Sequence, residues 1–152
     1  MSNMKVSILI NNFNYARFLS EAIESALEQT YPARDVQVVV VDDGSTDESM
    51  DVIDSYKGRI TRVAKKNGGQ GSAMNAGFEA CEGDIVCMLD ADDYFFRGKV
   101  AEVVKAFNED NCAGWHFHEL AEVADSRCLT VRSAAIADEK KPIDSRAMIR
   151  KG

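Results

Sequence analysis

Three aspartates lie within four residues directly after a buried apolar run. Residues 85–89 are apolar, Asp90 follows them, and Asp92 and Asp93 come next. Two carboxylates about 4 Å apart repel each other by roughly 4 kcal/mol at an effective dielectric of about 20, so the cluster must be solvated, protonated or neutralised. Mg2+ and Mn2+ prefer hard oxygen ligands and leave room for phosphate oxygens. The cluster therefore predicts a metal site for a ligand that carries phosphate.

Three further polar clusters stand where other apolar runs end. Each follows a predicted strand: Asn11 and Asn12 follow residues 6–10, Asp42 and Asp43 follow residues 36–41, and Asn67 follows residues 60–63. The run 36–41 is apolar at nearly every position, which is typical of a central parallel strand covered on both faces. All four clusters are thus candidates for one site, provided that the strands are parallel neighbours.

Helical patterns separate these strands. Four helices are predicted, over residues 15–28, 46–56, 72–80 and 100–107. Apolar residues recur in the first at helical spacing, from Tyr15 and Phe18 to Leu27, and Ser45 with Glu48 resembles a capping box that would start the second. Strict alternation of strands and helices predicts an α/β fold with a mostly parallel sheet and helices on both faces. Ligands of such sheets bind at the carboxyl edge, where the four polar clusters would meet.

The last third of the chain follows another pattern. Residues 112–123 and 128–131 are predicted to form a hairpin added to the sheet, and the polar stretch from residue 137 onward is predicted to be a loosely packed helix or a frayed end. His116 and His118 would face the same side of a strand, but the sequence offers no third metal ligand, so we interpret them as ordinary strand residues. The whole chain, 1–152, is predicted to be one domain.

The four motifs together resemble those of family 2 glycosyltransferases with the GT-A fold. They read VSILINNFNY at 6–15, VVVDDGSTD at 39–47, NGGQGSAMNAG at 67–77 and LDADD at 89–93, in the family's order and spacing. The resemblance covers roughly residues 4 to 118 and implies a three-layer, Rossmann-like α/β fold. It also implies a UDP- or GDP-sugar donor, a Mg2+ or Mn2+ ion, and inverting transfer of the sugar to an acceptor hydroxyl.

The resemblance also assigns roles to individual residues. It implies that the base and ribose are held by Asn11, Asn12, Phe13, Asp42, Asn67 and Asp90, and that the metal is bound by Asp92 with Asp93. Asp42 has a second interpretation, as a capping residue of the following helix. The chain departs from the family in carrying Asn11 where proline is common and Met74 where many members have an arginine near the diphosphate. The second change leaves more of the phosphate charge to the metal.

No catalytic base can be assigned from the sequence. In the family this carboxylate lies well beyond the acidic motif, whereas the chain continues for only 59 residues after Asp93 and residues 118–152 match the family poorly. Asp125, Asp138 and Asp144 are candidates by residue type alone. We therefore expect a donor-binding part whose acceptor half is missing. The alternative is a non-catalytic nucleotide-sugar-binding module or an inactive fragment; a phosphoacceptor receiver domain is disfavoured because strand one ends in asparagines rather than acids.

Composition limits the remaining possibilities. A net charge of −7 and a pI of about 4.8 argue against binding to nucleic acid or an anionic membrane surface. No apolar run is long enough to span a bilayer and no secretory signal is recognisable, so a cytoplasmic location is expected. The four cysteines are irregularly spaced and are predicted to be reduced. An open sheet edge could pair two copies of the chain, so a homo-oligomer is a further expectation; the acceptor could be a glycan, a lipid or a protein.

Overall fold

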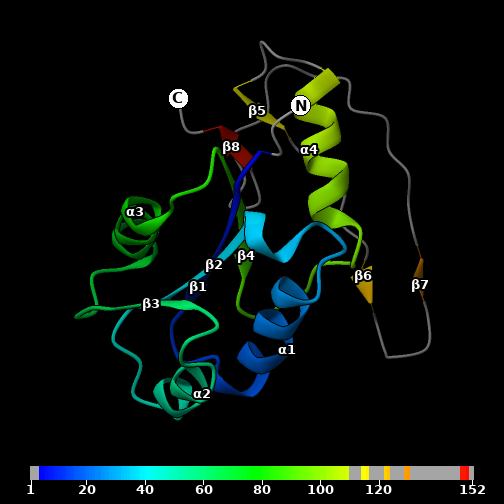
Figure 1. Ribbon diagram of the computed structural model, residues 1–152. Coiled ribbons are helices and arrows are strands. Elements are labelled where there is room, and N and C mark those ends of the chain that lie inside the picture. The colour runs from blue at the N-terminus through cyan, green and yellow to red at the C-terminus, as the bar shows by residue number, and fades with distance from the viewer. Residues whose placement is uncertain (1–3, 110–113, 117–121, 124–128, 131–147, 151–152) are drawn as a thin grey trace.

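A six-stranded mixed sheet forms the centre of the molecule (Figure 1). The computed structural model describes residues 4–109, 114–116, 122–123, 129–130 and 148–150. In the order β3-β2-β1-β4-β8-β5, the strands are β3 (Thr61–Ala64), β2 (Val36–Asp42), β1 (Val6–Asn12), β4 (Ile85–Asp90), β8 (Met148–Arg150) and β5 (Trp115–His116). The first four are mutually parallel, as the alternating pattern predicts.

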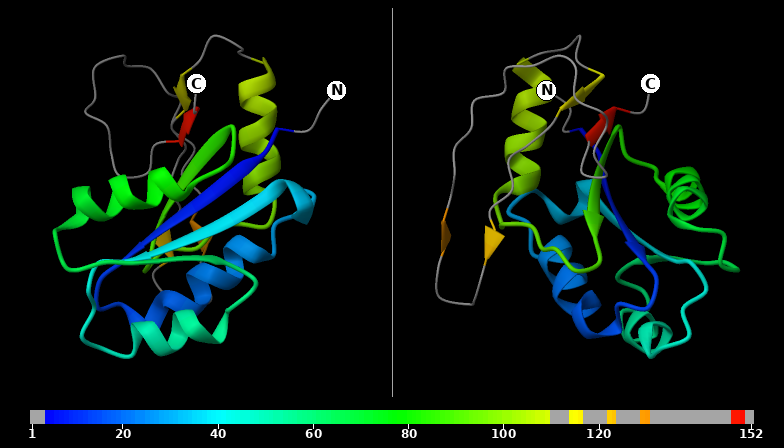
Figure 2. Two further views of the ribbon diagram at one scale, coloured as in Figure 1. Left: turned by 60° about the vertical axis from the view of Figure 1, so that its left-hand side comes forward. Right: turned by 180° about the vertical axis from the view of Figure 1, so that it is seen from behind.

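Helices cover both faces of the sheet, which gives the predicted three layers (Figure 2). They are α1 (Ala16–Leu27), α2 (Ser49–Ser55), α3 (Gln70–Ala80) and α4 (Lys99–Glu109), with a short 3-10 helix η1 (Ala33–Asp35) before β2. Helices α1, α2 and α4 share one apolar cluster with one face of the sheet, and α3 packs on the opposite face. The α/β fold class is therefore confirmed.

Strand β2 shows why an unbroken apolar run suits this position. Val38 and Val40 pack into the cluster beneath α1 and α4, whereas Val39 and Val41 pack beneath α3. Side chains alternate between the two faces of a strand, and both faces are covered from Val38 to Val41, so these four positions are all apolar.

Small residues allow α3 to approach the sheet closely. Ala73 and Gly77 are buried against it, and a Cβ atom on Gly77 would lie only 2.3 Å from a methyl carbon of Leu9 and 2.5 Å from one of Val41. The small residues of this helix are thus used for packing on the sheet. The close approach also sets where the first residue of α3, Gln70, lies relative to the carboxyl edge.

The two-residue strands agree with the sequence prediction only in part, because β5, which lies in the first predicted strand, belongs to the main sheet. β6 (Glu122–Val123) and β7 (Leu129–Thr130) pair antiparallel with each other, but they form a separate two-stranded sheet and do not extend the main one. The main sheet is instead extended by β8, which pairs antiparallel with β4 and with β5. The prediction that residues 148–150 belong to a helix or frayed end was wrong, because their backbone pairs with residues 85–87. Residues 131–147 lie outside the described residues.

The start of α2 also corrects a prediction. The helix begins at Ser49, and Glu48 precedes it without a capping side-chain hydrogen bond, so Ser45 and Glu48 do not form a capping box. The amide of Ser49 instead donates to the carboxylate of Asp47 at 3.0 Å. Ser45 is thereby free to bond elsewhere, and it does so with Asp42.

Lys99, the first residue of α4, is expected to destabilise the fold at neutral pH. Burial lowers its pKa to about 8, from an ordinary value of 10.5. Between these two values the unfolded chain binds more protons than the folded one, so stability rises with pH across this interval; below it the lysine is charged in both states and the burial cost is complete. Lys99→Met is expected to stabilise the protein by about 1 kcal/mol at pH 7 and by less at pH 10.

Thermal unfolding at the two pH values measures this difference. Lys105→Met is the matched control, because Lys105 lies on the same helix and is exposed. A lower midpoint for Lys99→Met at pH 7, or an unchanged difference at pH 10, would contradict the prediction.

Within the described ranges, no helix has both the length and the apolar character needed to cross a bilayer.

Candidate functional site

The carboxyl ends of the four parallel strands enclose one pocket of about 570 Å3. The register of the parallel strands places Asn12 beside Asp42 and Asn11 beside Asp90. The segments that follow β1, β2 and β4 therefore begin at the same edge of the sheet. The pocket is lined by Asn11, Phe13, Tyr15, Asp43, Asn67, Gly69, Gln70, Asp90, Ala91 and Asp92. All four polar clusters that the sequence placed at this edge contribute to the lining.

Most of the predicted site residues lie in this lining, and some do not. Five of them line the pocket: Asn11, Phe13, Asn67, Asp90 and Asp92. Asn12 and Asp42 are buried behind it. Asp93 is outside the lining, although its backbone amide donates to the carbonyl oxygen of Asp90 at 3.1 Å and so tightens the acidic turn.

Asp42 organises a buried hydrogen-bond network. Its carboxylate accepts hydrogen bonds from the side-chain amide of Asn12 at 2.8 Å, from the Ser45 backbone amide at 2.9 Å and from the Ser45 hydroxyl at 2.5 Å. The carboxylate is only 2% exposed, so these donors replace the water that it loses on burial. Asp42 and Asn12 thus join the segments that leave β1 and β2.

Asp43, to which the family resemblance assigns no role, is the aspartate of this pair that lines the pocket. It is 3% exposed and accepts hydrogen bonds from Lys65 Nζ at 2.6 Å, from the Gly68 amide at 3.0 Å and from the Gly69 amide at 2.8 Å. The hydrogen bond from Lys65 is the largest influence on this group, and together with the two amides it holds the pKa of Asp43 below its usual value despite burial. Asp43 is therefore ionised and is a hydrogen-bond acceptor only.

Two aromatic side chains form another wall of the pocket. Phe13 and Tyr15 line it, and each is 43% exposed. Tyr15 and Phe18 were predicted to lie on the buried stripe of the first helix, which was wrong: Tyr15 precedes α1, and both rings remain exposed and 6.3 Å apart between centroids. An exposed aromatic ring at a pocket suits a flat ligand group, because its face is apolar.

The charge of the pocket calls for a cation. Asp43, Asp90 and Asp92 contribute three carboxylates to the lining, which contains no lysine or arginine. Lys65 approaches Asp43 from outside the lining. Among the described residues, no three His, Cys, Asp or Glu side chains are grouped so as to hold a metal ion. An ion at Asp90 and Asp92 would need further oxygen ligands, which a bound phosphate could supply.

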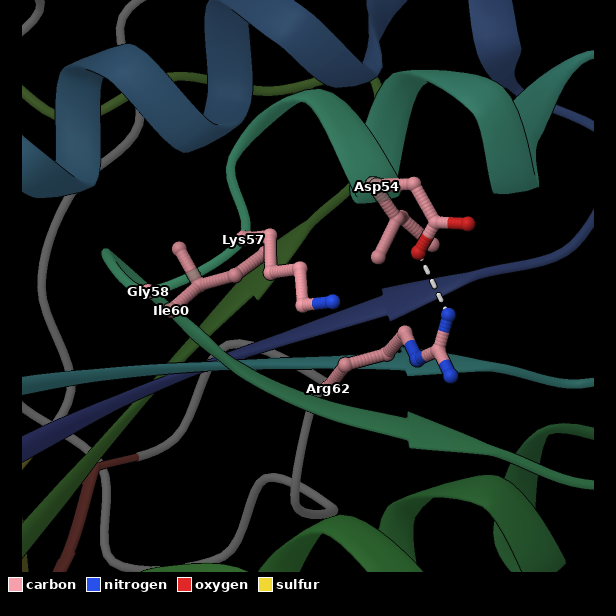
Figure 3. Close-up of a pocket in the computed structure, with 6 residues that line it drawn as sticks. Asp54, Lys57, Gly58, Ile60 and Arg62 are labelled. Carbon is pink, nitrogen blue, oxygen red and sulfur yellow. Dashed lines mark hydrogen bonds and ion pairs between the residues drawn. The ribbon is translucent and has the colours of Figure 1, made fainter.

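A second cavity, of about 390 Å3, lies beside β3 and the end of α2 (Figure 3). Its lining includes Lys57 and the ion pair formed by Asp54 and Arg62. None of the predicted site residues lies there, and its one carboxylate is already paired. This cavity does not resemble the acidic pocket in chemistry.

None of the other residues considered in the sequence, the histidines, three later aspartates and the cysteines, is among the described residues that line the acidic pocket. His116 belongs to β5, but its side chain is not described; His118, Asp125, Asp138 and Asp144 lie outside the described residues. Cys81 and Cys87 are buried and form no disulfide, and desolvation raises the pKa of the Cys87 thiol to about 12, so neither sits where a reactive thiol is expected. Cys112 and Cys128 are also outside the described residues.

A family model described as glycosyl transferase family 2 matches residues 7–128. The chain belongs to this family. An uncharacterised glycosyltransferase from Nostoc sp. is 39% identical over 150 residues, which make up 96% of this chain and 45% of that protein. The chain thus spans less than half the length of this relative.

Solved structures agree on the fold. The crystal structure of S. aureus TarS 1–349 in complex with UDP superposes with a TM-score of 0.79 at 22% identity, covering 97% of this chain and 47% of that one. The mannosyltransferase PcManGT from Pyrobaculum calidifontis, solved with GDP-Man and Mn2+, gives a TM-score of 0.67 at 25% identity over 76% of this chain and 35% of that one. The expected GT-A fold of family 2 is therefore confirmed.

Proposed function

We propose that the acidic pocket binds the nucleoside diphosphate of a sugar donor, as the donor-binding part of an enzyme that transfers the sugar to an acceptor hydroxyl with inversion. The observation that carries this proposal is the composition of one 570 Å3 pocket, where an aromatic wall, amide side chains and the carboxylates Asp90 and Asp92 meet. A nucleoside diphosphate presents a flat base, a ribose and a charged diphosphate. The aromatic wall suits the base, the amide side chains suit polar atoms of the base and ribose, and the carboxylates suit a metal ion bound to the diphosphate.

The nucleoside end is assigned to the Phe13 and Asn67 side of the pocket. Phe13 offers a ring for the base, and Asn11 and Asn67 offer amide groups for polar atoms of the base and ribose. Asp43 is an ionised acceptor, so it favours a base edge that carries an N–H group, as uracil and guanine do. Asn12 and Asp42 support this side from behind through their buried network.

The diphosphate end is assigned to the acidic turn. Asp90 would contact the ribose, and Asp92, with Asp93 beside it, would hold a Mg2+ or Mn2+ ion. When bound, the ion supplies a Lewis acid for the oxygen on which charge builds as the glycosidic bond breaks. The Mn2+ in the PcManGT complex and the UDP in the TarS complex support this choice of ligand and ion.

Nucleotide titration calorimetry tests the proposal. UDP, GDP and ADP are titrated into the chain with and without Mn2+. We expect UDP or GDP to bind at least tenfold more tightly with Mn2+, because an ion held at the acidic turn by Asp92 would offset the negative charge of both the turn and the diphosphate. Absence of binding by every nucleotide in the presence of Mn2+ would overturn the proposal.

The competing function is a module that binds the donor without turning it over. Hydrolysis of UDP-GlcNAc or GDP-mannose separates the two cases. Released sugar above the uncatalysed rate supports an enzyme, and binding without hydrolysis supports the module.

A further inference from the structure

Two loops at the edge of the sheet meet on one buried carboxylate. Asp43 follows β2, and all three donors to its carboxylate come from residues 65–69, in the loop between β3 and α3. The Lys65 ammonium, whose side chain is 21% exposed, also donates to the carbonyl oxygen of Lys66 at 2.7 Å. One lysine therefore connects the Asp43 carboxylate to the backbone just before Asn67.

The backbones of these two loops are in direct contact. The Lys65 amide donates to the Asp42 carbonyl at 3.0 Å. A Cβ atom on Gly44 would lie 2.7 Å from the backbone nitrogen of Asn67, and one on Gly68 would lie 3.0 Å from Lys65 Nζ. Asn67 is exposed, but its backbone lies against Gly44, so its position depends on the contacts of the loop that carries it.

We propose that Lys65 is a positioning residue for the nucleoside end of the ligand: its ammonium fixes Asp43 and the loop 65–69, so that Asp43, Asn67 and Gln70 face the pocket together. Lys65 lies outside the lining of the pocket, so it acts through these residues and not by contact. This inference rests on the proposed function. Lys65 belongs neither to the four sequence motifs nor to the lining of the pocket.

The positive charge of Lys65 also offsets the negative charge of Asp43. Asp43, Asp90 and Asp92 share the pocket, and the adjacent Asp42 is also buried. Lys65 is the lysine that pairs with Asp43, whereas the side chain of Lys66 is exposed. Removing one partner of a buried ion pair leaves an uncompensated charge, so the loop is expected to rearrange when Lys65 loses its ammonium.

Calorimetry with uridine monophosphate and UDP, each with and without Mn2+, measures this effect in the full chain. Lys65→Met is expected to weaken both nucleotides by about tenfold and by equal factors, because it disturbs the nucleoside end that they share. Lys66→Met is the matched control: it removes the same charge one residue away and should change affinity by less than twofold. Lys65→Arg keeps the charge and should recover part of the affinity.

A double variant distinguishes positioning from general loss of structure. If Lys65 acts through Asp43, then Asp43→Asn combined with Lys65→Met should bind no more weakly than Asp43→Asn alone, whereas independent effects would multiply. Unchanged affinity in Lys65→Met, or multiplied losses in the double variant, would overturn the inference while leaving the proposed function intact.

Amide hydrogen exchange at Gly68 and Gly69 reads the same loop without any ligand. Their amides should exchange at least tenfold faster in Lys65→Met than in the unaltered chain and the Lys66→Met control. Equal exchange rates would overturn the inference even if nucleotide binding were weakened. Failure of the unaltered chain to bind any nucleotide would instead overturn the proposed function, and the donor-positioning role with it.

Discussion

Replacing Asp92 with asparagine is expected to raise the dissociation constant of UDP in the presence of Mn2+ by about 100-fold, which corresponds to about 2.7 kcal/mol. Asp92 lines the pocket and is exposed, so its carboxylate is available to an ion, and asparagine keeps its shape while removing the charge. Binding without the metal should change little, or improve slightly, because one negative charge leaves the phosphate site. Calorimetry at constant ionic strength measures the UDP affinity with and without Mn2+.

The control for this variant removes an equal charge elsewhere. Asp51 is exposed on α2, away from the pocket lining, and Asp51→Asn should leave the Mn2+-dependent affinity unchanged. Equal losses in both variants would show that net charge, not the acidic turn, governs binding. An unaltered Mn2+ effect in Asp92→Asn would place the ion elsewhere in the protein.

Gly44→Ala is expected to impair both stability and nucleotide binding. Gly44 has a φ of +77°, where an added side chain is strained by about 1 kcal/mol. Its new Cβ would also lie 2.7 Å from the backbone nitrogen of Asn67. Backbone atoms cannot rotate away, so the loop that carries Asn67 must shift; we expect a total loss of about 3 kcal/mol in the free energy of unfolding and at least tenfold in nucleotide affinity.

Gly58→Ala separates the two causes. Gly58 has a similar φ of +85°, but its added Cβ would meet nothing within 4 Å. This variant should lose about 1 kcal/mol and keep its nucleotide affinity. Urea unfolding of both variants gives the comparison; equal losses would mean that the contact with Asn67 carries no cost.

Local patterns in the sequence were sufficient to predict the order of the main strands and helices. The run 36–41, apolar at every position but Gln37, and the helical spacing around Leu19 and Ile23 are properties of neighbouring residues, so they are readable without a structure. Strands of two or three residues carry no such signal. β8 was missed for this reason, because Met148 to Arg150 become a strand only through pairing with β4.

The sequence also determined which polar clusters meet, since parallel topology sends every strand end to one edge. It did not determine which of two adjacent aspartates enters the pocket. Asp42 and Asp43 are adjacent and have the same side chain. They differ because Ser45 and Asn12 donate hydrogen bonds to Asp42, whereas Lys65, Gly68 and Gly69 donate to Asp43 at the pocket wall. Those donors lie 22 to 26 residues from Asp43 in the chain, so only tertiary packing could bring them to it and make the choice.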